Sequence, residues 1–178
     1  MASLVDRMIR ASKLDVNLYE EVEADKGAMG QALAVVVISS VAAGIGTLGV
    51  LGIRGLIFGT LGALIGWFIW AFLAFVIGTK LLPEPQTKSD MGEMLRTIGF
   101  ASSPGVIRIL AFIPFLGAII SIVASVWMLV AMIIAVRQAL DYKSTWRAIA
   151  VTLIGFIIYF IIFAVIFSAL GVAPPAAA

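Results

Sequence analysis

Residues 90–147 read DMGEMLRTIGFASSPGVIRILAFIPFLGAIISIVASVWMLVAMIIAVRQALDYKSTWR, and this stretch determines the predicted number of membrane crossings. From residue 98 to residue 136 the only charged side chain is Arg108. At 1.5 Å per helical residue the run is about twice as long as one span, so we expect it to fold back on itself. Pro114 and Gly117 bracket the turn, because proline interrupts the helical ladder and glycine permits a reversal. The stretch therefore predicts two spans.

The composition indicates an integral membrane protein. Of the 178 residues, 62% are hydrophobic and only 12% are charged, whereas about a quarter of the residues in a soluble domain are charged. Cysteine and histidine are both absent, which removes disulfides, thiolate nucleophiles, imidazole metal ligands and the usual general base. We therefore expect no cofactor, no metal site and no nucleic-acid partner.

Three further apolar runs complete an all-α bundle of five transmembrane helices. They cover residues 31–51, 56–79 and 148–170, and each is about the 20 residues that a helix needs to cross the hydrocarbon core. The predicted domains are a cytoplasmic amphipathic segment, the five-helix membrane domain and a short outer tail, at residues 1–30, 31–171 and 172–178.

Lysine and arginine lie almost entirely on one side of this predicted topology. Cytoplasmic segments of membrane proteins accumulate these residues, so the asymmetry predicts a cytoplasmic N-terminus and an outer C-terminus. On the opposite side only Arg54 is found, in a short hairpin, and Arg108 is unassigned. The residues on the cytoplasmic side are Arg7, Arg10, Lys13, Lys26, Lys80, Lys88, Arg96, Arg137, Lys143 and Arg147.

The N-terminal segment predicts two short helices at the cytoplasmic surface. Arg7, Arg10 and Lys13 alternate with apolar residues at helical spacing, a pattern that suits contact with anionic lipids. Asn17 is the predicted cap of a second helix over residues 18–24. This helix carries an acidic cluster that is either a solvated face or a docking site for a cytosolic partner. The cluster consists of Glu20, Glu21, Glu23 and Asp25.

A stripe of small residues marks one face of the second predicted span. Gly55, Gly59, Gly62 and Gly66 are spaced by four, three and four residues, which lets another helix approach closely. We expect the first span to pack on this stripe. The same motif could also join two copies of the chain in a homo-oligomer.

Arg108 is the ionised residue that the topology places nearest to hydrocarbon. A charged side chain at the membrane centre costs roughly 2.5–3.5 kcal/mol on insertion scales, and no Asp or Glu lies within a predicted span. Arg108 either snorkels toward outer phosphates or contacts an anion or lipid headgroup in a groove, with local polarity from carbonyls freed near Pro104. Together with the outer Arg54 and the basic N-terminal residues, it is a candidate contact for lipids or partners.

The membrane spans lack the groups that most catalysis and coupled transport require. They contain serines but no base to activate one, and no buried carboxylate. The leading hypothesis is a non-enzymatic scaffold or accessory subunit that contacts lipids and other integral membrane proteins, or that acts in membrane organisation or trafficking. The alternative is a transport or lipid-handling component with Arg108 in a polar groove.

Several ordered residues in the opening stretch resemble a known family. These residues are Arg96, Gly99, Pro104, Pro114, Gly117, Trp127 and Arg137. The pattern resembles the Yip-one domain family of Ypt/Rab-interacting multispan membrane proteins. The resemblance implies non-enzymatic work in membranes and structural roles for these residues as entry charge, kink, turn and packing positions.

The N-terminal segment departs from the eukaryotic members of this family. Those relatives associate with Rab-type GTPases and usually carry a longer cytosolic region than the segment 1–30, which argues against a Rab-type GTPase as partner here. The compact chain, rich in Ala, Gly and Val, looks more like the prokaryotic members. The resemblance therefore implies a prokaryotic cytoplasmic membrane.

Overall fold

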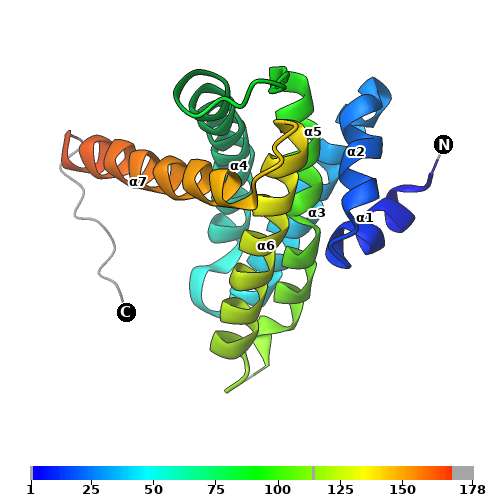
Figure 1. The fold of residues 1–178 in the computed structure, drawn as a ribbon. Coiled ribbons are helices and arrows are strands. Elements are labelled where there is room, and N and C mark those ends of the chain that lie inside the picture. Colours follow the sequence, from blue (N-terminus) through cyan, green and yellow to red (C-terminus); the bar gives the residue numbers. More distant parts are fainter. Residues whose placement is uncertain (1, 114, 170–178) are drawn as a thin grey trace.

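The computed structural model describes residues 2–113 and 115–169, and the elements in this part of the chain are helical (Figure 1). In chain order they are α1 (Leu4–Ser12), α2 (Val16–Ala24), η1 (Lys26–Ala28), α3 (Met29–Gly46), α4 (Leu48–Val76), η2 (Ile77–Leu81), α5 (Met91–Ala101), η3 (Ser103–Phe112), α6 (Gly117–Ala139) and α7 (Thr145–Ala169).

The two predicted N-terminal helices are present as α1 and α2. The cap of α2 is Asp15, whose carboxylate accepts a hydrogen bond from the backbone N–H of Asn17. Asn17 is therefore not the cap, and the prediction was wrong by two residues. Both helices pack against the side of the bundle, α1 against α5 and η3, and α2 against α5 and α6.

The connection between α3 and α4 lies earlier than the sequence predicted. Helix α3 ends at Gly46, and Thr47 separates it from α4. Gly52 then takes a φ of 61°, a left-handed conformation that glycine adopts without steric cost, so the backbone of α4 bends there. As a result Arg54 lies within α4 rather than in a hairpin loop.

The Asp90 cap and the break at Pro104 are both seen in the third predicted span. Asp90 and Glu93 form a reciprocal capping box at the start of α5. Helix α5 ends at Ala101 and a 3₁₀ helix, η3, follows with Pro104 in its first turn. The change of helix type occurs because proline has no N–H to donate. The carbonyl of Phe100, four residues earlier, instead accepts from the Ser103 hydroxyl at 2.7 Å.

Four helical segments in the described part of the chain are long and apolar enough to cross a membrane. They are Lys26–Gly46, Gly52–Leu81, Gly117–Ala139 and Thr145–Ile162. The remaining predicted crossing corresponds to α5 and η3. These are an α-helix followed by a 3₁₀ helix instead of one continuous α-helix. Pro114 and the predicted outer tail, residues 172–178, lie outside the described residues, whereas Gly117 begins α6.

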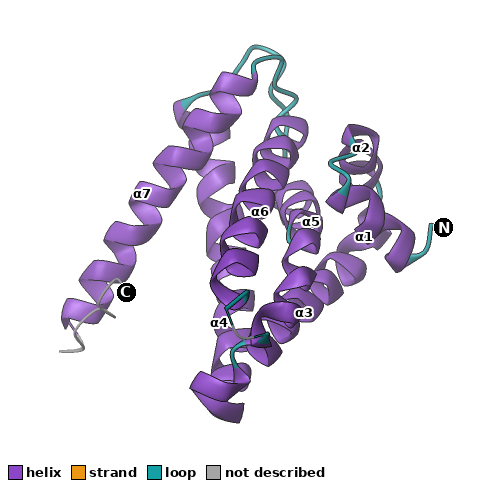
Figure 2. Ribbon diagram, turned by 90° about the horizontal axis from the view of Figure 1, so that it is seen from below, coloured by secondary structure: helices purple, strands orange, loops and turns teal. Residues whose placement is uncertain are grey.

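The protein interior consists of two apolar clusters that both include residues of α5. One contains Met94 and Ile98 and joins α5 to α4, α6 and α7. The other contains Phe100 and Ala101 and joins α5 to the N-terminal helices, α3 and α6. Helix α7 packs on the bundle near its start and then diverges from α6, as the two perpendicular views show (Figures 1 and 2).

Three segments that the sequence assigned to one side of the membrane meet at one end of the molecule. The amide of Gln86 donates to the carbonyl of Asp141 at 3.0 Å, and the backbone N–H of Lys143 donates to Glu84 at 3.0 Å. Gln138, near the end of α6, donates to Glu20 of α2. These hydrogen bonds tie the connections after α4 and α6 to each other and to the N-terminal helices.

Candidate functional site

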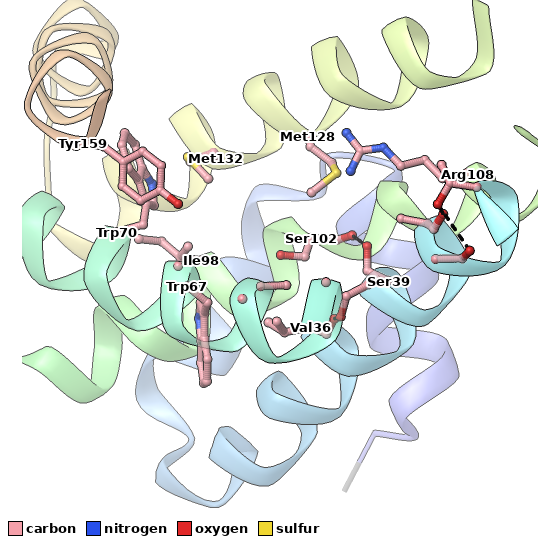
Figure 3. Close-up of a pocket in the computed structure, with 18 of the residues that line it drawn as sticks. Val36, Ser39, Trp67, Trp70, Ile98, Ser102, Arg108, Met128, Met132 and Tyr159 are labelled. Carbon is pink, nitrogen blue, oxygen red and sulfur yellow. Dashed lines mark hydrogen bonds between the residues drawn. The ribbon is translucent and has the colours of Figure 1, made fainter. Parts of the chain in front are cut away.

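A cavity of about 460 Å³ lies between α3, α4, α5, η3, α6 and α7, and we refer to it as the glycine cavity (Figure 3). Its walls combine glycines with aromatic, methionine and hydroxyl side chains and a single arginine. Its lining is Val36, Ser39, Ser40, Ala43, Gly44, Thr47, Gly55, Gly59, Gly62, Ala63, Gly66, Trp67, Trp70, Ile98, Ser102, Arg108, Met128, Met132, Phe156 and Tyr159.

The predicted glycine stripe forms one wall of this cavity. A Cβ atom built on Gly59 or Gly62 would meet no heavy atom within 4 Å, and one on Gly66 would lie 3.1 Å from the Tyr159 hydroxyl. The expected close approach of the first span is therefore not seen at Gly59 and Gly62. The two helices meet instead at Gly44, where a Cβ would lie 2.9 Å from Leu56.

Arg108 lies at one end of the glycine cavity (Figure 3). Its Nη2 donates a hydrogen bond to the hydroxyl of Ser125 at 2.8 Å, and the residue is half-buried. No carboxylate pairs with Arg108 within the described residues. The structure thus places the predicted arginine in a groove, where it can present further N–H donors to an anion.

The break at Pro104 contributes polar atoms beside the same cavity. The Ser39 hydroxyl of α3 donates to the carbonyl of Ser102 at 2.9 Å, so this carbonyl is satisfied across two elements. A Cβ on Gly105 would overlap Ser39 Oγ and lie 2.8 Å from the sulfur of Met128. The glycine therefore permits α3, η3 and α6 to approach closely at this point.

Aromatic side chains close the opposite end of the cavity. Trp70 is 5% exposed, and its ring centroid lies 4.3 Å from Phe156 and 6.2 Å from Tyr159. Its Nε1 is buried without a hydrogen-bond partner in the described structure. The sequence did not identify Tyr159 or Phe156, because the face that α7 turns toward α4 depends on tertiary packing.

The predicted lipid contacts of the N-terminal segment are corrected in part. The Arg7 side chain is 4% exposed and pairs with Glu21 at 2.9 Å and Asp25 at 2.8 Å, so it is not available to a lipid. Arg10 pairs with Asp15 and Glu21. The charges of α1 face α2 because the acidic cluster lies there, and sequence spacing alone could not show that pairing.

Lys13 and Arg54 are exposed, as a lipid or partner contact requires. Lys13 lies at a second, apolar groove between α1 and the bundle, which also includes Val5, Ile9 and Trp127. The indole N–H of Trp127 donates to the carbonyl of Ser12 at 2.8 Å. Trp127 therefore ties α1 to α6 rather than lining the glycine cavity.

Glu23 differs from the rest of the acidic cluster. Burial, and secondarily the nearby carboxylates of Glu20, Asp141 and Glu93, raises the pKa of Glu23 from 4.5 to about 8. One oxygen of Glu23 is buried without a hydrogen-bond partner in the described structure. Beside it, the buried Arg96 donates to the carbonyls of Val22 and Glu23. The cluster is therefore not simply a solvated face.

The raised pKa of Glu23 predicts a pH-dependent stability. Between pH 4.5 and about 8 the folded chain holds a proton that the unfolded chain has lost, so this residue makes the fold less stable as the pH rises through that window. Glu23→Gln cannot titrate and should flatten the fall in melting temperature between pH 5 and pH 8 in detergent. Asp6→Asn, at an exposed acid, is the control, and an equal effect there would contradict the assignment.

The arrangement suits the binding of an amphiphile. The described residues contain no group of three or more acidic residues that could hold a metal ion, and the glycine cavity presents hydroxyls next to a cation instead of next to a base. The glycine cavity has one positively charged end, at Arg108, and an apolar, aromatic interior.

Comparison with known proteins identifies a family. A family model described as Yip1 domain matches residues 17–166, which cover most of the chain from α2 to α7. No curated protein and no solved structure gives a significant match.

Proposed function

Because the chain belongs to the Yip1 domain family, we propose that this multipass membrane protein is a non-enzymatic scaffold or accessory subunit in membrane organisation or trafficking. The observation that carries the proposal is the course of α7, which leaves the bundle (Figures 1 and 2) and exposes large apolar side chains along the part that the structure describes. The exposed side chains on α7 include Leu153, Ile157, Phe160, Ile161 and Val165.

The proposed occupant of this face is a transmembrane helix of another integral membrane protein. In lipid, a helix gains stability mainly from van der Waals packing and hydrogen bonds with other helices, and these five side chains of α7 are each more than half exposed. Phe160 is 66% exposed and also stacks beside Phe156 at a centroid distance of 6.3 Å. Phe160 is therefore an aromatic side chain that projects from the protein.

Co-purification tests this scaffold role. After extraction in mild detergent, the wild-type protein should be recovered in a fixed ratio with one membrane protein, and Phe160→Ala should reduce that ratio about tenfold because it removes an aromatic anchor. The matched control is Phe58→Ala on α4, where the phenylalanine is 70% exposed. Recovery of the wild-type chain as an isolated monomer, or equal loss in both variants, would contradict the proposal.

We also propose that the end of the molecule formed by the N-terminal helices and the connections after α4 and α6 faces the cytoplasm. The excess of lysine and arginine in these segments supports this orientation, with the C-terminus outside if α5 and η3 together form a fifth crossing. The chain contains no cysteine, so a single cysteine at Lys88 should react with an impermeant thiol reagent only after cell lysis.

A second candidate function is lipid handling, and the glycine cavity favours it. Its apolar interior and its single arginine match a ligand with an apolar chain and an anionic head. This candidate predicts that a labelled phospholipid moves between the two leaflets faster in vesicles that contain the protein than in vesicles without it.

A further inference from the structure

We propose that the glycine cavity binds one acyl chain of an anionic phospholipid, with the lipid phosphate at the guanidinium of Arg108. This inference rests on the lipid-handling candidate and names its ligand class. It is carried by the charge, the length and the size of the cavity.

The charge of the cavity lies at one end only. Arg108 is the single charged residue of its described lining, and the aromatic side chains of Trp70 and Tyr159 lie at the opposite end (Figure 3). The guanidinium carries five N–H donors in a planar fork that suits phosphate oxygens, and one nitrogen is engaged by Ser125. An anionic headgroup would therefore find donors where the cavity begins and apolar surface beyond.

The glycine wall has the length of one membrane leaflet. The helical rise from Gly55 to Gly66 is about 16 Å at 1.5 Å per residue, and half of the hydrocarbon core is about 15 Å. Both glycines line the cavity. An acyl chain with its headgroup near Arg108 would lie along this wall with its end near Trp70.

The size of the cavity suits one acyl chain. Its volume of about 460 Å³ is within the range of small-molecule sites, roughly 300–1,000 Å³. Met128 and Met132 on the facing wall are flexible apolar side chains that adapt to a chain of irregular shape.

Native mass spectrometry of the full chain tests the site directly. The purified protein is offered equal amounts of phosphatidylglycerol and phosphatidylcholine with identical acyl chains. The wild type should retain phosphatidylglycerol about tenfold better, because its headgroup has a net negative charge beside Arg108, whereas the choline cation of phosphatidylcholine offsets the charge of the phosphate. Arg108→Gln should remove this preference, and Lys88→Gln, at an exposed lysine outside the cavity, should preserve it.

A second pair of variants tests the acyl-chain part of the site. Gly62→Leu should place its side chain in the cavity, because a Cβ there meets nothing within 4 Å, and retention of both lipids should fall about tenfold. Gly49→Leu is the matched control, since a Cβ at Gly49 is equally free and Gly49 does not line the cavity. Unchanged melting temperatures would show that both variants fold.

Several results would overturn the inference. These are an unchanged headgroup preference in Arg108→Gln, undiminished lipid retention in Gly62→Leu, displacement of the lipid by equimolar glycerol phosphate, or a lipid-free dimer that Gly62→Leu dissociates. The lipid-handling candidate can fail separately: if lipid is retained as expected but vesicles show no excess lipid movement, the site stands and the transport role does not.

Discussion

Gly46→Ala is expected to lower the free energy of unfolding by about 3 kcal/mol although it adds one methyl group. A Cβ at Gly46 would overlap the backbone carbonyl oxygen of Arg108 and lie 3.0 Å from the Cβ of Ala111. The obstacle is backbone rather than a flexible side chain, so α3 and η3 would have to separate. Because tightly packed interiors accommodate little added volume, the added methyl group should disturb the packing along the whole contact between α3 and η3.

The effect of Gly46→Ala can be measured as a fall in melting temperature in detergent, with Gly49→Ala as the control. Alanine normally stabilises a helix by up to about 1 kcal/mol relative to glycine, and a Cβ at Gly49 meets nothing within 4 Å. The two substitutions should therefore have opposite signs. Equal melting temperatures would show that α3 and η3 are not in the close contact described here.

This contact also connects stability to the candidate lipid site. The carbonyl that Gly46 approaches belongs to Arg108, so a displacement of η3 would move the guanidinium end of the glycine cavity. Residual folded Gly46→Ala protein should therefore show a weaker preference for phosphatidylglycerol than the wild type.

Arg7→Met is expected to destabilise the protein by about 2–3 kcal/mol. The Arg7 side chain is 4% exposed, while its partners Glu21 and Asp25 are 34% and 32% exposed. Breaking a fully buried pair costs about 3–5 kcal/mol because a charge is left without compensation, and the partial exposure of the two acids reduces this value. The Arg7 Nη1 also donates to the Gln31 side chain at 2.9 Å, so α1, α2 and α3 all lose a link.

Limited proteolysis and melting temperature together measure the effect of Arg7→Met. Cleavage within α1 should become faster than in the wild type as the helix detaches from α2. Lys13→Met on the same helix is the control, because Lys13 is exposed and forms no ion pair in the described structure. Similar proteolysis of the two variants would show that the arginine ion pairs do not hold α1.

Local patterns in the sequence predicted the helical elements well where neighbouring residues decide the structure. Asp90 and Glu93 form the expected capping box, and Pro104 stands at a break in the helix, because both effects act within one turn of backbone. The cap of α2 was misplaced because Asp15 and Asn17 are both good capping residues, and only the observed hydrogen bond selects Asp15.

Long-range packing was less predictable. The sequence placed Gly59 and Gly62 against another helix, but they line a cavity, because small residues permit a close approach without specifying what occupies the space. Arg7 was expected at the lipid surface, yet its side chain is buried and pairs with Glu21 of α2 and with Asp25. Arg108 was the candidate site residue that the structure placed in a groove.

The sequence by itself determined that this is an all-helical multipass membrane protein with the Yip1 domain pattern, because hydrophobic length and short-range backbone chemistry are local properties. Only the tertiary structure decided which charges are paired and which remain available. It brought Arg108 of η3, the glycine stripe of α4 and Tyr159 of α7 to one cavity. The physical reason is that the space between helices depends on which faces meet and at what angle, and that choice is made by packing over the whole bundle.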